Sequence, residues 1–210
     1  MSGRLCCVSF WEHQKPVHRN RAVAIDAIAR ESVALLDTGG LRALTIRAVA
    51  SRLDVAAPSL YSRISSVDDL FDLALDHALG QDTGVERCLE GSSIFDLLIA
   101  VHRHLCRHRW ACQVIGFRAP RGPNYLRLSE RMIILLTQNG VPDPVGTAAA
   151  ASNFVIGSAL TSPVATDEHP SPINPDVAPH YADLYAEHPR DPGQILAAGL
   201  TALLEHDSNR

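Results

Sequence analysis

Apolar side chains recur every three or four residues along the first third of the chain, a spacing typical of helices and not of strands. The first run covers residues 20–38 and stops at Gly39 and Gly40, and glycines commonly end a helix. A second, short helix is predicted over 46–53, because Thr45 is a good N-cap and one apolar stripe follows it. After a brief break, Pro58 falls where proline is tolerated, in the first turn of a third helix of about two turns. The pattern therefore predicts two short helices joined by a tight turn and braced by a longer one.

Helical periodicity continues through the rest of the chain, and no segment alternates convincingly as a strand would. Further helices are predicted from Ser66 to Leu79 and over residues 94–109, 125–138, 144–160 and 191–205. Residues 161–179 hold five prolines, a density that predicts a loop and excludes a continuous helix. We therefore expect an all-α fold, with a three-helix unit at the N-terminus and a larger helical domain after it.

The composition is that of an ordinary globular protein, with 46% apolar and 20% charged residues. No apolar run is long enough to span a membrane, and the N-terminus lacks a signal-peptide pattern, so a cytoplasmic location is expected. Five irregularly spaced cysteines without a CxxC pair indicate neither a disulfide framework nor a zinc ribbon. There is no P-loop, dinucleotide fingerprint, nucleophile elbow or HExxH pair, which argues against an enzyme and predicts no cofactor.

Charge is distributed unevenly along the chain. The whole protein carries a formal net charge of −4, but residues 15–64 contain eight basic and four acidic side chains. A basic unit with two short helices joined by a tight turn is typical of a helix-turn-helix, whose second helix lies in the major groove of duplex DNA. The alternative is that the two helices are only part of a helical bundle.

On the DNA interpretation, the residues expected to contact DNA are Thr45, Arg47, Ala57, Pro58, Ser59, Tyr61, Ser62 and Arg63. Arg63 suits a guanine or a phosphate, and Tyr61 and Ser59 suit phosphate oxygens. Thr45 and Arg47, at a helix N-terminus, suit a phosphate. A flexible basic arm is predicted over residues 1–19, and its end either enters the minor groove or is a solvated terminus.

The motifs of the N-terminal unit resemble the TetR/AcrR family of transcriptional regulators. They are Leu44-Thr45-Ile46-Arg47-Ala48-Val49-Ala50, Leu53-Asp54-Val55, Leu60-Tyr61 and Asp69-Leu70. Farther along, Arg118-Ala119-Pro120, Asn139-Gly140 and Ser152-Asn153-Phe154 resemble the C-terminal domain of the tetracycline-repressor branch. The resemblance implies a DNA-binding domain over 20–66 and a ligand-binding and dimerisation domain over 67–210. It further implies a homodimeric repressor that a small molecule releases from a palindromic operator.

Two departures from the family pattern affect these expectations. Many relatives have a phosphate-contacting lysine at the start of the fourth helix, where this chain has Val67. The histidine and glutamate that help to hold magnesium-bound tetracycline in the tetracycline repressor correspond to Ile115 and Thr161. The resemblance therefore does not extend to a tetracycline–magnesium ligand.

Ligand-binding residues are expected where aromatic and polar side chains lie among aliphatic ones in the larger domain. The candidates are Trp110, Phe117, Arg118, Asn153 and Phe154, although each could equally pack in the core or at an interface. Small residues in 144–160 and 191–205 permit close helix approach and favour a four-helix dimer interface.

A cluster of histidines and cysteines at 102–112 offers an alternative function. Helical spacing is expected to place His104, His108 and Cys112 on one face, which suggests a metal- or redox-responsive regulator. Three arginines interleaved with them oppose cation binding, and histidine-rich solvent faces are common. We expect no metal site.

Overall fold

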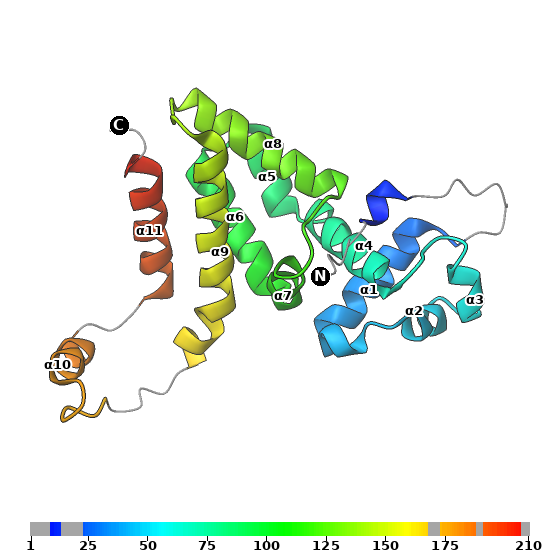
Figure 1. Ribbon diagram of the computed structural model, residues 1–210, viewed down its shortest axis with the longest axis horizontal. Coiled ribbons are helices and arrows are strands. Elements are labelled where there is room, and N and C mark those ends of the chain that lie inside the picture. The colour runs from blue at the N-terminus through cyan, green and yellow to red at the C-terminus, as the bar shows by residue number, and fades with distance from the viewer. Residues whose placement is uncertain (1–8, 14–22, 168–172, 188–190, 207–210) are drawn as a thin grey trace, which may run out of the picture.

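The computed structural model describes residues 9–13, 23–167, 173–187 and 191–206, and within these ranges it contains helices and no strand (Figure 1). The expected all-α fold is confirmed. The α-helices are α1 (Ile25–Gly39), α2 (Ile46–Arg52), α3 (Ala57–Leu60), α4 (Val67–Gly80), α5 (Thr83–Gly91), α6 (Ile94–Arg107), α7 (Arg109–Ile115), α8 (Pro123–Gln138), α9 (Pro144–Asp167), α10 (Pro179–Glu187) and α11 (Pro192–His206). Two 3-10 turns, η1 (Phe10–Glu12) and η2 (Leu41–Ala43), complete them. No described helix meets the length and apolarity that crossing a membrane requires.

Helices α1, α2 and α3 form a small head at one end of the molecule (Figure 1). The predicted cap is confirmed, since Thr45 Oγ1 accepts a hydrogen bond from the Ala48 amide at 3.0 Å. Asp54 adopts a left-handed backbone (φ 52°) in the turn between α2 and α3. Val49 and Leu60 are fully buried, so each short helix is fixed by its apolar face.

Helix α3 is shorter than predicted. Its α-helical part ends at Leu60, after which the chain continues as a hydrogen-bonded turn in which the Arg63 and Ile64 amides both donate to the Leu60 carbonyl. Ile64 is 2% exposed, so burial of this side chain continues the apolar face although the regular helix has ended.

Helix α4 connects the head to the larger domain and packs against both α1 and α8. Its N-cap Ser66 accepts from the Asp68 amide at 3.1 Å, as expected for a helix start. Ten of its residues are buried, and three of these are the carboxylates Asp69, Asp72 and Asp76. Buried charge of this kind must be paired, so α4 receives donors from several other segments.

The described part of the N-terminal arm is not free. Phe10 is fully buried, its amide donates to Asp72 Oδ2 at 2.9 Å, and His13 Nε2 lies 3.1 Å from Asp69 Oδ1. Residues 9–13 are thus docked on α4, which corrects the prediction of a flexible arm over 1–19 for this part. The short apolar stretch around Phe10 is long enough to fill a gap in the core but too short to show a helical period. The basic residues from Lys15 to Arg21 lie outside the described residues.

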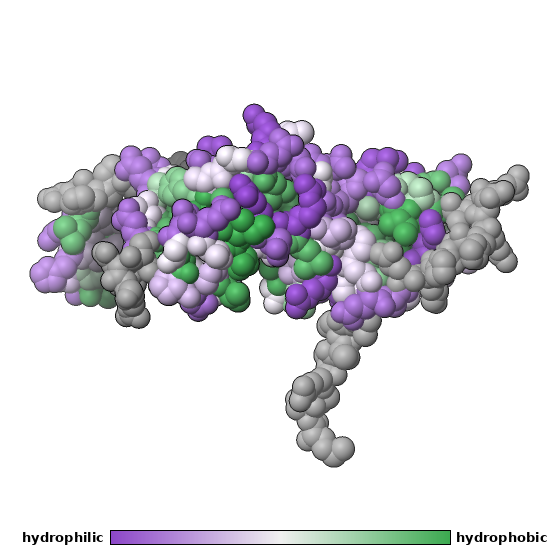
Figure 2. Space-filling view, turned by 90° about the horizontal axis from the view of Figure 1, so that it is seen from above, coloured by the Kyte–Doolittle hydropathy of each residue, from purple (hydrophilic) through white to green (hydrophobic). Residues whose placement is uncertain are grey.

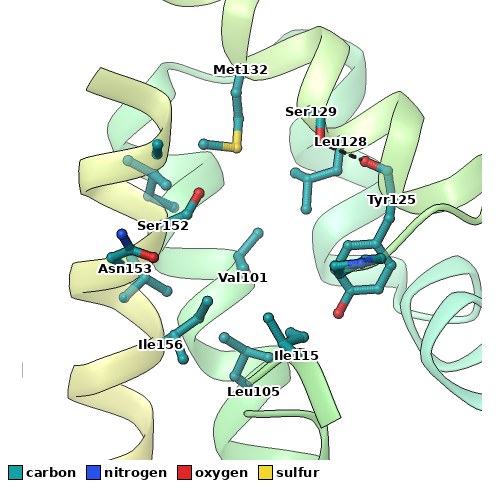
Figure 3. A pocket seen from close by; sticks show the side chains of 14 residues that line it. Val101, Leu105, Ile115, Tyr125, Leu128, Ser129, Met132, Ser152, Asn153 and Ile156 are labelled. Carbon is teal, nitrogen blue, oxygen red and sulfur yellow. Dashed lines mark hydrogen bonds between the residues drawn. The ribbon is translucent and has the colours of Figure 1, made fainter. Parts of the chain in front are cut away.

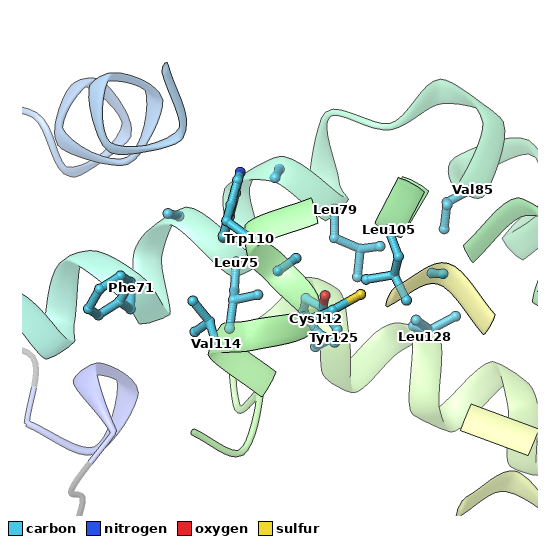
Figure 4. Close-up of a cluster of buried hydrophobic side chains, with 14 of the residues drawn as sticks. Phe71, Leu75, Leu79, Val85, Leu105, Trp110, Cys112, Val114, Tyr125 and Leu128 are labelled. Carbon is cyan, nitrogen blue, oxygen red and sulfur yellow. The ribbon is translucent and has the colours of Figure 1, made fainter. Parts of the chain in front are cut away.

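The larger domain contains α5 to α11, and Figure 4 shows its core beside α4, where Leu75, Trp110 and Tyr125 meet. Helix α9 runs to Asp167 and α10 begins at Pro179, so the loop predicted over 161–179 is wrong at its start, where α9 continues, and agrees with the structure at its end to within one residue. Pro163 falls within α9, and a proline inside a helix removes one backbone hydrogen bond. Helix α9 packs along α6 and α11, and this packing offsets the loss. Helices α5, α7 and α10 were not predicted.

Candidate DNA-binding surface and ligand cavity

The candidate DNA-binding residues gather on the head. Thr45, Arg47, Pro58, Ser59, Tyr61 and Ser62 are exposed, and Ala57 and Arg63 are half-buried. Tyr61 is a large aromatic side chain that is 54% exposed, which is unusual for a residue that packs in a core. The surface therefore presents hydroxyl groups and the two arginines Arg47 and Arg63, and no carboxylate of the described residues forms an ion pair with either. Their contacts with DNA stay a prediction.

Arg63 has a structural partner within the head. Its Nε donates to the Val23 carbonyl at 2.9 Å, which ties the chain two residues before α1 to the turn after α3. This contact fixes the guanidinium at the edge of the expected DNA surface and uses one of its five N–H donors. Val67, at the position where the resemblance led us to expect a lysine, is half-buried and packs against the core, so it offers no charge to a phosphate.

Two carboxylates, the exposed Asp37 and the buried Asp72, join the head and α4 to the α7 region. Asp37 of α1 accepts from Trp110 Nε1 at 2.7 Å and lies 2.8 Å from His108 Nδ1. Asp72 of α4 accepts from Arg118 Nε and Nη2 at 2.7 Å each, and Asp68 lies 3.0 Å from Arg118 Nη1. Two of the predicted ligand-binding residues, Trp110 and Arg118, thus hold segments of the protein together.

A cavity of about 260 Å³ lies between α6, α7, α8 and α9 (Figure 3). Its lining comprises Leu98, Val101, Leu105, Ile115, Pro120, Tyr125, Leu128, Ser129, Met132, Ala149, Ser152, Asn153, Val155 and Ile156. The lining is mostly aliphatic, with neutral polar groups contributed by α8 and α9. This composition is typical of a pocket for a small organic ligand.

Of the five predicted ligand-binding residues, Asn153 lines this cavity and the other four do not. Phe117 is 51% exposed and makes an edge contact with Phe71, at a ring separation of 5.8 Å. Phe154 points toward α11, where it lies so close to Gly199 that a β-carbon there would collide with its ring. The aliphatic lining residues were not predicted, because residues around a cavity have the same sequence pattern as residues in a packed core.

The start of α8, which carries Tyr125 into the cavity wall, is anchored by Asp76 of α4. The Asp76 carboxylate accepts from the Asn124 amide at 2.9 Å, from Asn124 Nδ2 at 2.9 Å and from the Tyr125 amide at 3.2 Å. Burial raises the pKa of Asp76 above its usual range, and these hydrogen bonds oppose that effect. Gly122 lies directly against Asp76, so a β-carbon at this position would overlap the carboxylate.

Comparison with known proteins identifies the family. A profile described as the tetracyclin repressor-like C-terminal domain matches residues 95–190. An HTH-type transcriptional regulator from Saccharopolyspora erythraea is 35% identical over 181 residues, which are 83% of this chain and 75% of that protein. The chain belongs to the TetR family of transcriptional regulators. This family consists of DNA-binding proteins and not of enzymes, as the sequence predicted.

Further relatives of this TetR-family regulator agree with that assignment. The HTH-type transcriptional repressor DrrR1 from Streptomyces coeruleorubidus is 30% identical over 65% of this chain, a match that spans 53% of DrrR1. ActR from Streptomyces coelicolor has the same fold, with a TM-score of 0.74 at 24% identity over 91% of this chain and 97% of ActR. A structure of ActR in complex with actinorhodin superposes with a TM-score of 0.72 at 22% identity, over 89% of this chain and 95% of ActR.

The histidines and cysteines at 102–112 do not form a metal site in the regulator. Helix α6 ends at Arg107 and Cys112 lies in α7, so the predicted common face of His104, His108 and Cys112 does not exist. Among the described residues, no three His, Cys, Asp or Glu side chains are arranged to hold a metal ion. Burial raises the pKa of the Cys112 thiol to about 11, which disfavours the reactive thiolate.

His104 in this cluster has a structural role. It is fully buried, and its Nδ1 lies 2.9 Å from Asp82 Oδ2, which also pairs with Arg107. Burial and the neighbouring His108 lower the pKa of His104 to about 4, so the imidazole is neutral near pH 7. The pair ties the start of α5 to the end of α6.

Proposed function

We propose that this chain is a homodimeric repressor that leaves a palindromic operator when a small molecule occupies the cavity between α6, α7, α8 and α9. The observation that carries the proposal is the position of α7. One end of this helix contributes Ile115 to the cavity lining, and the other end holds Asp37 of the head through Trp110.

The segments that follow α7 extend this coupling. Arg118, three residues after Ile115, pairs with Asp68 and Asp72 in α4, the helix that carries the head. A ligand that displaces the cavity wall therefore acts on α1 and on α4 through charged or polar contacts. Such contacts tolerate little displacement, because hydrogen bonds weaken steeply once their geometry is lost.

Dimerisation would use α9 and α11, which lie side by side at the end of the molecule opposite the head (Figure 1). Exposed residues follow a helical stripe on each: Gly146, Ala150, Gly157 and Leu160 on α9, and Ile195, Ala198 and Ala202 on α11. Small residues of this kind let two helices approach closely. Two heads related by a two-fold axis would read a palindromic site.

The test is binding to DNA from the regulator's own upstream region, measured by gel shift with footprinting. The Arg47→Ala variant is expected to bind every fragment roughly tenfold more weakly or worse, because a charged phosphate contact is lost. Arg127→Ala is the matched control, since Arg127 is an exposed arginine on α8 that pairs with Glu86 away from the head. A folded protein that binds no fragment, or an Arg47→Ala variant that binds like the control, would contradict the proposal.

A further inference from the structure

Tyr125 is a buried tyrosine whose hydroxyl group has no hydrogen-bond partner among the described residues. The side chain is 9% exposed, and its ring forms part of the cavity wall. In Figure 3 the hydroxyl oxygen points toward Ile115, away from the backbone of α8. This oxygen is not among the sealed polar atoms without a partner in the described residues, so it is open to the cavity, and a ligand that accepts its hydrogen bond would replace water there.

The ring of Tyr125 has little freedom to turn its hydroxyl elsewhere. The Tyr125 amide donates to Asp76, which also holds Asn124, so the first turn of α8 is fixed on α4. Burial raises the pKa of Tyr125 far above its ordinary value, and the group is therefore a neutral donor at any physiological pH.

The described residues around the cavity carry no charge. The lining contains no Asp, Glu, Lys, Arg or His, and its polar side chains other than Tyr125 are Ser129, Ser152 and Asn153. A charged group placed among these residues would lose its water without gaining a partner of opposite charge. The cavity volume of about 260 Å³ lies below the range of roughly 300–1,000 Å³ that is common for ligand sites, so the occupant is small.

We propose that the cavity binds a small, uncharged and mostly apolar molecule with a carbonyl-type oxygen that accepts a hydrogen bond from the Tyr125 hydroxyl. The aliphatic side chains supply the area that is removed from water. Tyr125 then fixes the orientation, and Ser152 and Asn153 of α9 contact further polar groups of the ligand. This inference rests on the proposed function only in taking the cavity as the effector site.

Three flat probes of similar shape test the inference by equilibrium dialysis against the DNA-free protein. They are fluorenone, fluorene, which lacks the carbonyl oxygen, and fluorenone-2-carboxylate, which adds a charge. Fluorenone is expected to bind, and the carboxylate to bind at least about tenfold more weakly. Tyr125→Phe keeps the ring and should weaken fluorenone binding roughly two- to tenfold while leaving fluorene binding unchanged.

Tyr181→Phe is the matched control, because Tyr181 is a 51% exposed tyrosine on α10. The proposal is overturned if fluorenone does not bind, if Tyr125→Phe weakens fluorenone and fluorene equally or neither, or if the carboxylate binds as well as fluorenone. Circular dichroism of each variant shows that it is folded. Because the dialysis contains no DNA, a failure here leaves the DNA-binding result of the gel shift untouched, and a failure of DNA binding leaves this result untouched.

Discussion

At the scale of single residues, buried carboxylates carry the long-range connections of this protein. Asp72 illustrates the arrangement, since it receives the Phe10 amide from the N-terminal segment and the Arg118 guanidinium from the loop after α7. Asp82 does the same for His104 and Arg107. Each carboxylate has these hydrogen-bond partners only in the folded chain. A change in a partner's protonation therefore changes the free energy of unfolding.

We predict that His104 makes the folded protein sensitive to mild acid. Its pKa of about 4 lies below the ordinary value of 6.5, so between these pH values the unfolded chain binds a proton that the folded chain does not. This contribution is fully present above pH 6.5 and is lost as the pH falls toward 4. The free energy of unfolding, measured with urea, should fall by about 2–3 kcal/mol between pH 7 and 4.5 because of this residue.

The His104→Gln variant provides the comparison, because it removes the titrating group. Its unfolding free energy should change less steeply over the same pH range. His180→Gln, at an exposed histidine of α10, should leave the wild-type slope unchanged. Equal slopes for the wild type and His104→Gln would show that His104 binds protons equally well in the folded and the unfolded chain, which contradicts a lowered pKa.

At the scale of elements, periodicity predicted the long helices, and the short helices α2 and α3 were predicted only because a cap and a proline marked where they begin. The apolar stripes of α1, α6 and α8 extend over several turns, and their predicted ranges agree closely with the structure. Helix α7 spans seven residues and η1 three, and neither has a side-chain cap that marks its start as Thr45 marks α2. These elements are specified by partners far along the chain, as Phe10 is by Asp72, and no local pattern reveals such a partner.

For the same reason, the helix caps of the head were easier to predict than the lining of the ligand cavity. Thr45 is recognisable as a cap because its partner, the Ala48 amide, lies three residues away. Trp110 and Arg118 were expected to bind ligand because an aromatic or charged side chain among aliphatic ones suggests a pocket. Their partners Asp37 and Asp72 lie on other helices, and only the folded chain brings them together.

We predict that η1 is a stabilising part of the fold. Replacing the fully buried Phe10 with alanine removes a large apolar side chain from the core and should lower the free energy of unfolding by about 3 kcal/mol. Tyr181→Ala, at an exposed aromatic residue, should change it little. Thermal and urea unfolding measure both variants, and a Phe10→Ala protein as stable as the control would mean that residues 9–13 are not docked in solution.

At the scale of the whole molecule, the head and the exposed stripes of α9 and α11 lie at opposite ends (Figure 1). Figure 2 shows hydrophilic residues over most of the upper face, with hydrophobic patches between them. The proposed dimer would cover the hydrophobic residues on the two stripes. It would also leave both heads free to reach DNA.

Ile195→Asp tests this arrangement, because it places a charge at a 51% exposed residue of the α11 stripe. Burying an unpaired carboxylate between two copies should shift the protein from dimer to monomer in light scattering coupled to size exclusion, at unchanged helix content. Val177→Asp is the control, since Val177 is 80% exposed and precedes α10. A variant that stays dimeric would place the interface elsewhere.

The short length of α7 has a consequence for how such a regulator can evolve. Ile115 and Trp110 lie on one rigid helix, so their relative direction is set by the number of residues between them. Inserting or deleting one residue there would rotate one end against the other by about 100°. The cavity and the head would each remain intact, but Ile115 and Trp110 could no longer face the cavity and Asp37 at the same time. Substitutions in the lining can therefore change which molecule is sensed, whereas the register of this single helix decides whether sensing reaches the DNA.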